Sequence, residues 1–403
     1  MPSPRTVSAL AVVGGALFAV TACTPTLTVT TAKIDPTPQV ELVANPIQAS
    51  EVDPNAPVLV AATQGVLTEI SVTGPEGEVP GTLSDDRTEW IATSGPLDYA
   101  ATYTVNAVGS DSRGRTDFLT HSFTTVEPEK FFTASATPAA GEVVGVGMPI
   151  VVTFNKKVDN KAEVEEALIV RTSTPVLGAW SWVNDREVEY RPQELWPGNT
   201  QVQLAMNLQG VQSKPGVFGA ADTIQEFSFR PAMVSVVDAA TYNMDVFKDG
   251  ELIKTIPITT GKSGFETRSG TKVILSKERS RVMDAATGGT DTSDPEYYRV
   301  TAEYAMRLNY TGEFVHAAPW SVGSQGRANV SHGCVGMSTA NAEWWWSQNN
   351  IGDVVIVENT PRTQAHDNNG ITVWNDTWEN WLSRSATGAK MTETFQPASI
   401  SGR

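Results

Sequence analysis

The sequence predicts a mainly β protein, with two β-sandwiches, a β-rich third domain and a short helical tail. From about residue 33 to 231, apolar and polar residues alternate in short runs and helical periodicity is almost absent. The two halves of this region look like copies spaced by about 100 residues. Beyond it, the turn Lys248, Asp249, Gly250 lies between two alternating apolar runs, which indicates a tight hairpin.

Composition narrows the class of protein. The chain has 403 residues, 40% of them hydrophobic, so it can form several domains with buried cores. A formal net charge of −16 argues against nucleic acid as a partner. The sequence contains two cysteines, Cys23 and Cys334.

The N-terminus has the pattern of an export signal. Arg5 precedes a short apolar run at 9–20, and small residues lead to Cys23. A cysteine in this context resembles a bacterial lipobox, so residues 1–22 are interpreted as a lipoprotein signal peptide. Acyl chains on Cys23 would then anchor the protein to the outer face of the cell membrane. An ordinary signal peptide cut nearby, or an uncleaved anchor, is the alternative. Residues 23–32, rich in threonine, indicate a linker.

We interpret residues 33–127 and 128–232 as two immunoglobulin-like sandwiches that lack the usual disulfide. Their corresponding aromatic positions are Trp90 with Tyr190 and Phe123 with Phe227. Residues 161–168 indicate one short helix. Neither sandwich contains a cluster of catalytic groups, which favours spacer or contact modules over enzymes.

Residues 233–358 form the predicted third domain. Pro257 lacks a backbone donor and therefore indicates an edge strand. Residues 287–295 are rich in glycine, threonine and aspartate, a composition typical of a mobile flap. Ser338 is expected to cap the start of a helix, and residues 354–357 to form a buried strand.

The tail, residues 359–403, is polar except for three tryptophans. Trp374, Trp378 and Trp381 are spaced by four and three residues, which places them on one helical face. We expect this helix to dock on the third domain. We expect residues 385–403 to be disordered.

The residues that indicate chemistry lie in the third domain, where a Val-His pair at 315–316 precedes Ser-His-Gly-Cys at 331–334. If Cys23 carries lipid, Cys334 has no disulfide partner, and an unpaired thiol in an exported protein favours a reactive role over a buried structural one. A cysteine attacks only as thiolate and needs a base, for which His316 is the candidate. A backbone carbonyl, that of Ala317, is expected to fix the His316 tautomer.

Gly333 allows a tight turn before the cysteine, and the N–H groups of Gly333 and Cys334 are expected to face a developing oxyanion. His332 is either the base or a residue that orders this turn, and the ordering role is favoured. A zinc site built from His316, His332 and Cys334 is disfavoured, because a fourth ligand is absent and the spacing is poor. No metal or other cofactor is expected.

These motifs resemble the YkuD-type L,D-transpeptidases, and most of all the actinobacterial lipoproteins with two immunoglobulin-like domains before the catalytic domain. The resemblance covers the mature chain. It implies that Cys334 is the nucleophile and His316 the base, and that Tyr298 helps to stabilise the oxyanion. It further implies substrate contacts, at Met283, Tyr298, Thr311, Gly312, Trp320, His332 and Gly336.

The implied substrates are peptidoglycan stem peptides: a tetrapeptide donor, which releases D-alanine, and a diamino acid acceptor, which completes a 3→3 cross-link. Acylation of the thiol by carbapenems is also implied. Gly336 stands where close relatives carry Asn or Arg, and Gly288 where a second flap tyrosine is expected. The alternatives are an L,D-carboxypeptidase with the same site, in which water replaces the amine, and a non-catalytic wall-binding lipoprotein.

Overall fold

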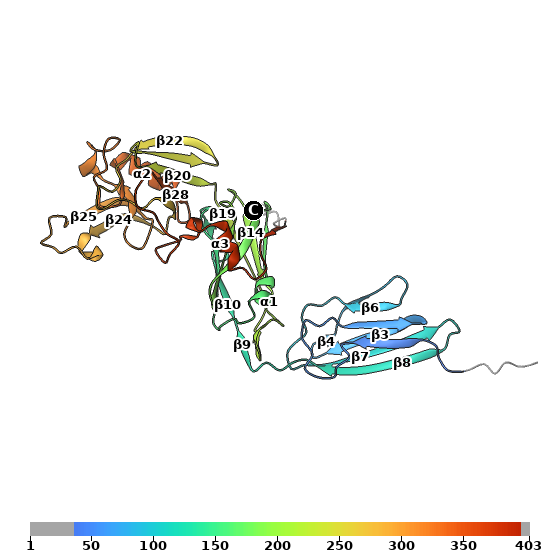
Figure 1. Ribbon diagram of the computed structural model, residues 1–403. Helices are drawn as coiled ribbons and strands as arrows, with labels where there is room; N and C mark the ends of the chain where they lie inside the picture. The colour runs from blue at the N-terminus through green and yellow to red at the C-terminus, as the bar shows by residue number, and fades with distance from the viewer. Residues whose placement is uncertain (1–35, 396–403) are drawn as a thin grey trace, which may run out of the picture.

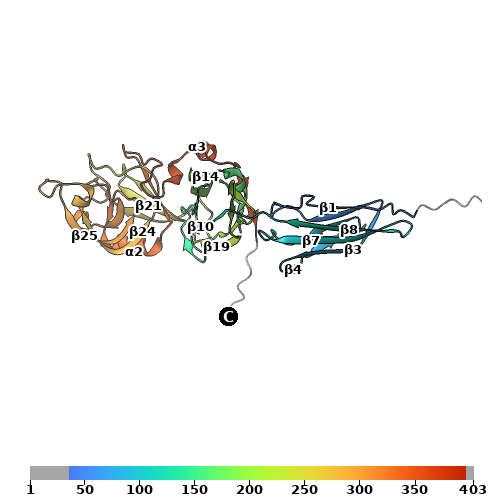
Figure 2. The same cartoon turned by 90° about the horizontal axis from the view of Figure 1, so that it is seen from below.

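The computed structural model describes residues 36–395, and Cys23 therefore lies outside the described residues. Figures 1 and 2 show three units following one another along an extended molecule, with the N-terminal unit at one end. The chain is mainly β, as predicted. No helix among residues 36–395 is long and apolar enough to cross a lipid bilayer.

The first unit is a sandwich of two four-stranded sheets, ordered β1-β2-β6-β5 and β4-β3-β7-β8. Its strands are β1 (Glu41–Asn45), β2 (Leu59–Thr63), β3 (Gly65–Gly74), β4 (Gly77–Glu78), β5 (Gly81–Leu83), β6 (Glu89–Ala92), β7 (Thr102–Asp111) and β8 (Thr116–Thr124). Alternate residues of β7, among them Tyr103 and Val105, point into the core, because successive side chains in a strand face opposite sides.

The second unit is a larger sandwich, with sheets ordered β10-β12-β15-β14-β29 and β11-β19-β16-β13-β30. Its elements before the third unit are β10 (Ala134–Thr137), β11 (Val143–Val144), β12 (Ile150–Phe154), α1 (Lys161–Glu166), β13 (Leu168–Thr172), β14 (Leu177–Asn184), β15 (Glu187–Pro192), β16 (Gln201–Met206) and β19 (Thr223–Phe229). Three short strands form a separate sheet beside it: β9 (Lys130–Phe132), β17 (Gln212–Lys214) and β18 (Val217–Gly219). The helix expected at 161–168 is confirmed as α1.

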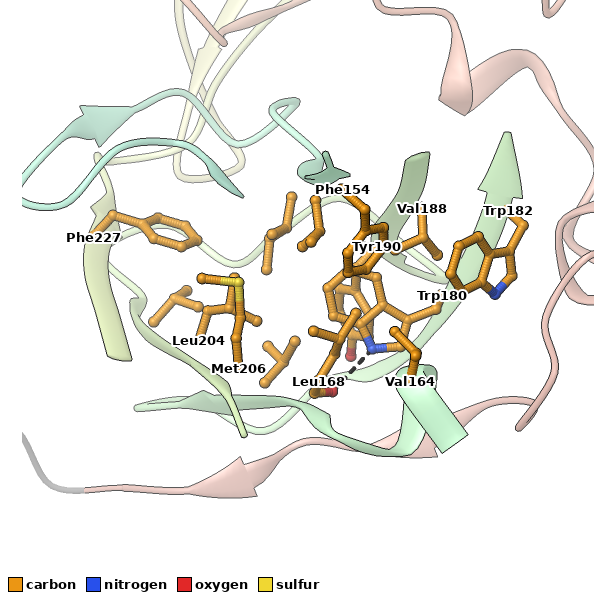
Figure 3. Close-up of a cluster of buried hydrophobic side chains, with 14 of the residues drawn as sticks. Phe154, Val164, Leu168, Trp180, Trp182, Val188, Tyr190, Leu204, Met206 and Phe227 are labelled. Atoms are coloured by element: carbon orange, nitrogen blue, oxygen red, sulfur yellow. Dashed lines mark hydrogen bonds between the residues drawn. The ribbon is translucent and has the colours of Figure 1, made fainter. Parts of the chain in front are cut away.

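Aromatic side chains fill the core of this second sandwich (Figure 3). Trp180 donates its indole N–H to the carbonyl of Leu168, 3.1 Å away, and packs edge-on against Tyr190. The paired aromatic positions of the two sandwiches occupy equivalent strands: Trp90 lies in β6 and Tyr190 in β15, while Phe123 lies in β8 and Phe227 in β19. The internal repeat in the sequence therefore corresponds to a repeat in structure.

The third unit contains a five-stranded sheet, ordered β22-β21-β20-β28-β23, and a four-stranded sheet, ordered β24-β25-β26-β27. Its elements are β20 (Met233–Asp238), β21 (Asn243–Lys248), β22 (Glu251–Pro257), β23 (Gly270–Val273), β24 (Ser276–Asp284), η1 (Ala285–Gly288), β25 (Arg299–Arg307), β26 (Phe314–Ala317), η2 (Pro319–Ser321), β27 (Val335–Met337), α2 (Thr339–Gln348) and β28 (Val354–Glu358).

Several local predictions for this unit are confirmed. Asp249 and Gly250 both have positive φ, as a tight hairpin turn between β21 and β22 requires. Pro257 ends β22, which is an edge strand. The hydroxyl of Ser338 accepts a hydrogen bond from the N–H of Asn341 and caps α2.

The short helix of the tail docks on the second sandwich and not on the third unit, so that prediction is wrong; the tail before this helix does contact the third unit, where Asn375 is hydrogen-bonded to Thr271. Trp381 is fully buried on β14 of the second sandwich, and its indole N–H donates to the carbonyl of Ala179, 3.0 Å away. Trp374 lies in η3 (Val373–Asn375), whereas Trp378 and Trp381 lie in α3 (Trp378–Ser383), so one helix does not carry all three. Their rings nevertheless converge on the guanidinium of Arg191, at 4.8 to 5.2 Å.

The expectation of disorder from residue 385 onward is also wrong as far as residue 395. Strand β29 (Lys390–Met391) pairs with β14, and β30 (Glu393–Thr394) pairs with β13. The buried carboxylate of Glu165 accepts hydrogen bonds from tail groups, which are the hydroxyls of Ser385 and Thr387 and the N–H groups of Ala386 and Thr387. The tail thus completes both sheets of the second sandwich.

Candidate active site

A cavity of about 280 Å³ in the third unit brings the predicted residues together. Its lining consists of Thr259, Met283, Tyr298, Val300, His316, Ala318, Trp320, Ser321, Val330, Ser331, His332, Cys334 and Gly336. The cavity therefore contains the thiol and the imidazole that the sequence pairs.

Strand pairing explains why Cys334 and His316 share this space. Strands β26 and β27 are parallel, and His316 lies directly opposite Gly336. Paired residues point to the same face of a sheet, and so do residues two apart in one strand. Cys334 is two residues before Gly336, so its side chain emerges on the same face as His316. Because Gly336 has no side chain, the residue paired with His316 leaves the cavity beside the imidazole open.

His316 is arranged as a neutral base. The residue is buried, and its Nδ1 contacts the carbonyl oxygen of Ala317 at 2.7 Å, which confirms the predicted acceptor. Since a carbonyl only accepts, Nδ1 carries the proton and Nε2 has a free lone pair. Burial lowers the pKa of His316, and the Ala317 carbonyl partly opposes that effect.

Cys334 is arranged as a neutral thiol. It forms no disulfide, is buried, and directs its Sγ to the carbonyl oxygen of Gly312 at 3.6 Å. Burial raises the pKa of Cys334 to about 12, although the backbone N–H of Phe314 opposes this effect. The resting pair is therefore a thiol and an uncharged imidazole.

The turn before the cysteine is held by two hydroxyls. Ser331 Oγ donates to the carbonyl of Cys334 at 2.6 Å and accepts from the N–H of Gly333 at 3.1 Å. Thr267 Oγ1 donates to the carbonyl of Gly333 at 2.9 Å. Gly333 has φ of 121°, which only glycine adopts readily.

This arrangement corrects one expectation. The N–H of Gly333 already donates to Ser331 Oγ, so it does not face the cavity as an oxyanion donor. The N–H of Cys334 forms no hydrogen bond with any described residue. Among the N–H groups of residues 331–334, those of His332 and Cys334 are the ones without an acceptor among the described residues, and Cys334 lines the cavity.

His332 forms its contacts with residues other than Cys334. Its Nε2 lies 2.7 Å from Oε2 of Glu296, and its ring packs against Phe265 at 4.7 Å and Tyr298 at 4.8 Å. These contacts fix the ring on the side of the cavity formed by the connection between β24 and β25.

Tyr298 and Met283 form that side of the cavity together with Val300. The Tyr298 hydroxyl forms no hydrogen bond with a described residue, and burial raises the pKa of the phenol. Trp320 lies at the rim, with over half of its surface exposed, and its ring is 5.9 Å from that of His316.

The remaining predicted contacts divide into two groups. Gly336 lines the cavity, and a Cβ there would lie 3.0 Å from Ala318 Cβ and 3.2 Å from Thr259 Cγ2. Thr311 and Gly312 are not among the lining residues. Thr311 is bonded to Asn309 and Asn369, whereas Gly312 takes part through its carbonyl.

Comparison with known proteins places the chain in a family. Residues 232–357 match the L,D-transpeptidase catalytic domain (YkuD), and residues 49–212 match a bacterial Ig domain (Big_10). L,D-transpeptidase 2 of Mycobacterium tuberculosis (strain CDC 1551 / Oshkosh) is 35% identical over 334 residues, 82% of this chain and 81% of the relative. The chain belongs to the L,D-transpeptidase family.

Further L,D-transpeptidases are similar over different lengths. L,D-transpeptidase 5 of Mycobacterium tuberculosis (strain ATCC 25618 / H37Rv) is 33% identical over 348 residues, covering 84% of this chain and 75% of the relative. The solved structure of LD transpeptidase LdtMt1 in complex with imipenem has 36% sequence identity and a TM-score of 0.48, and covers 56% of this chain and 97% of that chain.

Sequence reasoning missed the charged group behind this L,D-transpeptidase site. Glu313 is buried and bonded to Lys272, to Arg268 at 2.9 Å and to Asn309 at 2.8 Å. Its neighbours in the chain, Gly312 and Phe314, are the residues whose backbones form hydrogen bonds with the thiol. A glutamate directly before an apolar strand was the available signal, because such a charge is buried only when it is paired.

Proposed function

We propose that this L,D-transpeptidase cross-links peptidoglycan through a thioester on Cys334. The sulfur attacks the carbonyl carbon of the third residue of a tetrapeptide stem, and the amide bond to the terminal D-alanine breaks. The side-chain amine of a diamino acid in a second stem then attacks the thioester. A new amide bond forms, the sulfur leaves, and the product is a 3→3 cross-link.

His316 supplies the proton transfers that these steps need. Its Nε2 takes the thiol proton as the sulfur attacks and returns a proton to the departing D-alanine amine. In the second step it takes a proton from the incoming amine, and the thiol is regenerated. A neutral imidazole beside a neutral thiol suits this role, because the charge pair forms only when an acyl group is present to be attacked.

The N–H of Cys334 and the hydroxyl of Tyr298 are the proposed donors to the oxyanion. Both belong to residues that line the cavity, and neither group is engaged by another described residue. His332 acts as an ordering residue, because its Nε2 is occupied by Glu296. Met283, Trp320 and Gly336 form the surface against which the stem peptide lies.

We further propose that the protein acts at the outer face of the cell membrane, held by lipid on Cys23. The short apolar run ending in Val-Thr-Ala-Cys supports this. Mass spectrometry of the membrane fraction tests it: a diacylglyceryl mass on the N-terminal peptide is expected, and an unmodified Cys23 in the exported protein would contradict it.

The observation that carries the enzymatic proposal is the buried thiol that shares one cavity with an imidazole whose Nδ1 is held by Ala317. The test is intact mass after exposure to a carbapenem. A single adduct is expected on the wild-type protein, none on Cys334→Ala, and a slowed adduct on His316→Ala. A folded wild-type protein that forms no adduct would refute the enzymatic proposal and favour a wall-binding lipoprotein.

Incubation with disaccharide tetrapeptides then identifies the acyl acceptor. Dimers with a 3→3 bond indicate cross-linking. Tripeptides without dimers would indicate that water replaces the amine, as in an L,D-carboxypeptidase.

A further inference from the structure

The connection between β24 and β25, residues 285–298, is fastened to the rest of the catalytic unit at Glu296. Oε2 of Glu296 lies 2.6 Å from Nζ of Lys262 and 2.7 Å from Nε2 of His332. Both partners lie outside the connection: His332 belongs to the turn that ends in Cys334, and Lys262 is joined to that turn by its N–H, which donates to the carbonyl of Ser331 at 2.9 Å.

The other polar contacts of this connection are local. Asp291 bonds to Ser293, Asp294 accepts from the N–H of Glu296, and the N–H of Ala285 donates to the carbonyl of Tyr298. Among the described residues, Glu296 is the residue of 285–297 that forms hydrogen bonds or ion pairs with partners beyond this loop, β24 and β25. Tyr298 adds a ring contact to the same His332.

Resting on the function proposed above, we propose that Glu296 is a positioning residue that latches the β24–β25 connection onto His332 and Lys262, and thereby holds Tyr298 at the cavity. The ammonium group of Lys262 and the imidazole of His332 both contact Oε2 of Glu296. The loop is therefore connected through this one atom to the turn before Cys334 and to the backbone around residue 262. Tyr298 follows Glu296 by two residues, and its position therefore depends on the contacts of Glu296 with His332 and Lys262.

The latch is strong enough to bias the loop and weak enough to open. Side chains of Glu296 and Lys262 are 40% and 33% exposed, and ion pairs with such exposure contribute on the order of 1 kcal/mol or less. A contribution of that size changes the ratio of closed to open loop by roughly fivefold. Such a loop opens readily for a bulky stem peptide and closes again on the acyl group.

The test compares Glu296→Ala and Glu296→Gln with Asp291→Asn. Asp291→Asn removes the same charge from the same loop without touching Lys262 or His332, so it is the matched control. Two reagents are used on each protein at one pH: a carbapenem, whose acylation uses Tyr298, and iodoacetamide, a small electrophile that alkylates the sulfur without using Tyr298.

We expect Glu296→Ala to slow carbapenem acylation by up to about fivefold, with alkylation unchanged or faster, and Glu296→Gln to lie between. Salt at 1 M should slow the wild-type acylation toward that of Glu296→Ala and leave Glu296→Ala unaffected, because exposed ion pairs are screened. Equal acylation by Glu296→Ala and wild type, or an equal loss in Asp291→Asn, would overturn the proposal.

Hydrogen exchange separates this proposal from the proposed function. Glu296→Ala should increase exchange in residues 285–298 and leave β26 unchanged, whether or not the wild-type protein reacts with a carbapenem. Unchanged exchange in that segment would refute the latch even in an active enzyme. Increased exchange in a protein that forms no adduct would retain the latch and reject the enzymatic role.

Discussion

The buried thiol makes a quantitative prediction about the resting enzyme. At pH 7.5 an ordinary cysteine with a pKa near 8.5 is about one-tenth thiolate. A thiol whose pKa is raised to about 12 is roughly 3 parts in 100,000 thiolate at that pH, about 3000-fold less. A more basic thiolate is a better nucleophile and recovers about 40-fold of this difference. Alkylation of Cys334 should therefore be roughly 70-fold slower than that of an ordinary thiol.

The assay is the rate of iodoacetamide labelling of the Cys334 peptide between pH 6 and 10. The same protein unfolded in denaturant provides the reference thiol and removes the effect of burial. In the folded protein the rate should rise throughout this range without a plateau, because deprotonation occurs only near pH 12. A fast rate that is already constant below pH 8 would show a preformed thiolate–imidazolium pair and refute the reasoning.

Three further changes test other parts of the structure. Ser331→Ala removes the two hydrogen bonds that Ser331 contributes to the cysteine turn and keeps that of Thr267; it should lower the free energy of unfolding by about 1–3 kcal/mol and slow carbapenem acylation. Trp381→Ala should cost about 3–5 kcal/mol in urea unfolding, whereas the exposed Trp320→Ala should cost under about 1 kcal/mol; similar losses would contradict the docked tail. Burial, together with the nearby charge of Glu187, raises the pKa of Glu189 to about 7. The folded state therefore binds this proton more tightly than the unfolded state, and the free energy of unfolding falls as the pH rises from about 4.5 to 7. Glu189→Gln should therefore raise Tm at pH 8 and leave it nearly unchanged at pH 4.5; an equal effect at both pH values would exclude this cause.

Features with local causes were predictable from the sequence. The β21–β22 turn follows from Asp249 and Gly250, because adjacent residues with positive φ favour this hairpin. The start of α2 follows from Ser338, whose hydroxyl satisfies a free helical N–H. The pairing of Cys334 with His316 was also accessible, because the chemistry of a thiol nucleophile requires a nearby base.

Features that depend on distant partners were not predictable. The tryptophan spacing in the tail indicated an apolar face, but the surface that receives it is set by Arg191, nearly 200 residues earlier in the chain. The two-residue strands β29 and β30 carry no pattern of their own and exist because β14 and β13 offer free edges. Likewise, the N–H of Gly333 is occupied because of the rotamer of Ser331, which a motif does not specify.

The closure of the second sandwich by β29 and β30 constrains how the chain is made. Its two sheets gain their last strands from residues that leave the ribosome after the whole catalytic unit. Val354 of that unit also belongs to the second sandwich's core. Folding of residues 130–394 is therefore expected to finish as one late event, and a stop codon placed near residue 385 should damage the middle of the molecule more than its end.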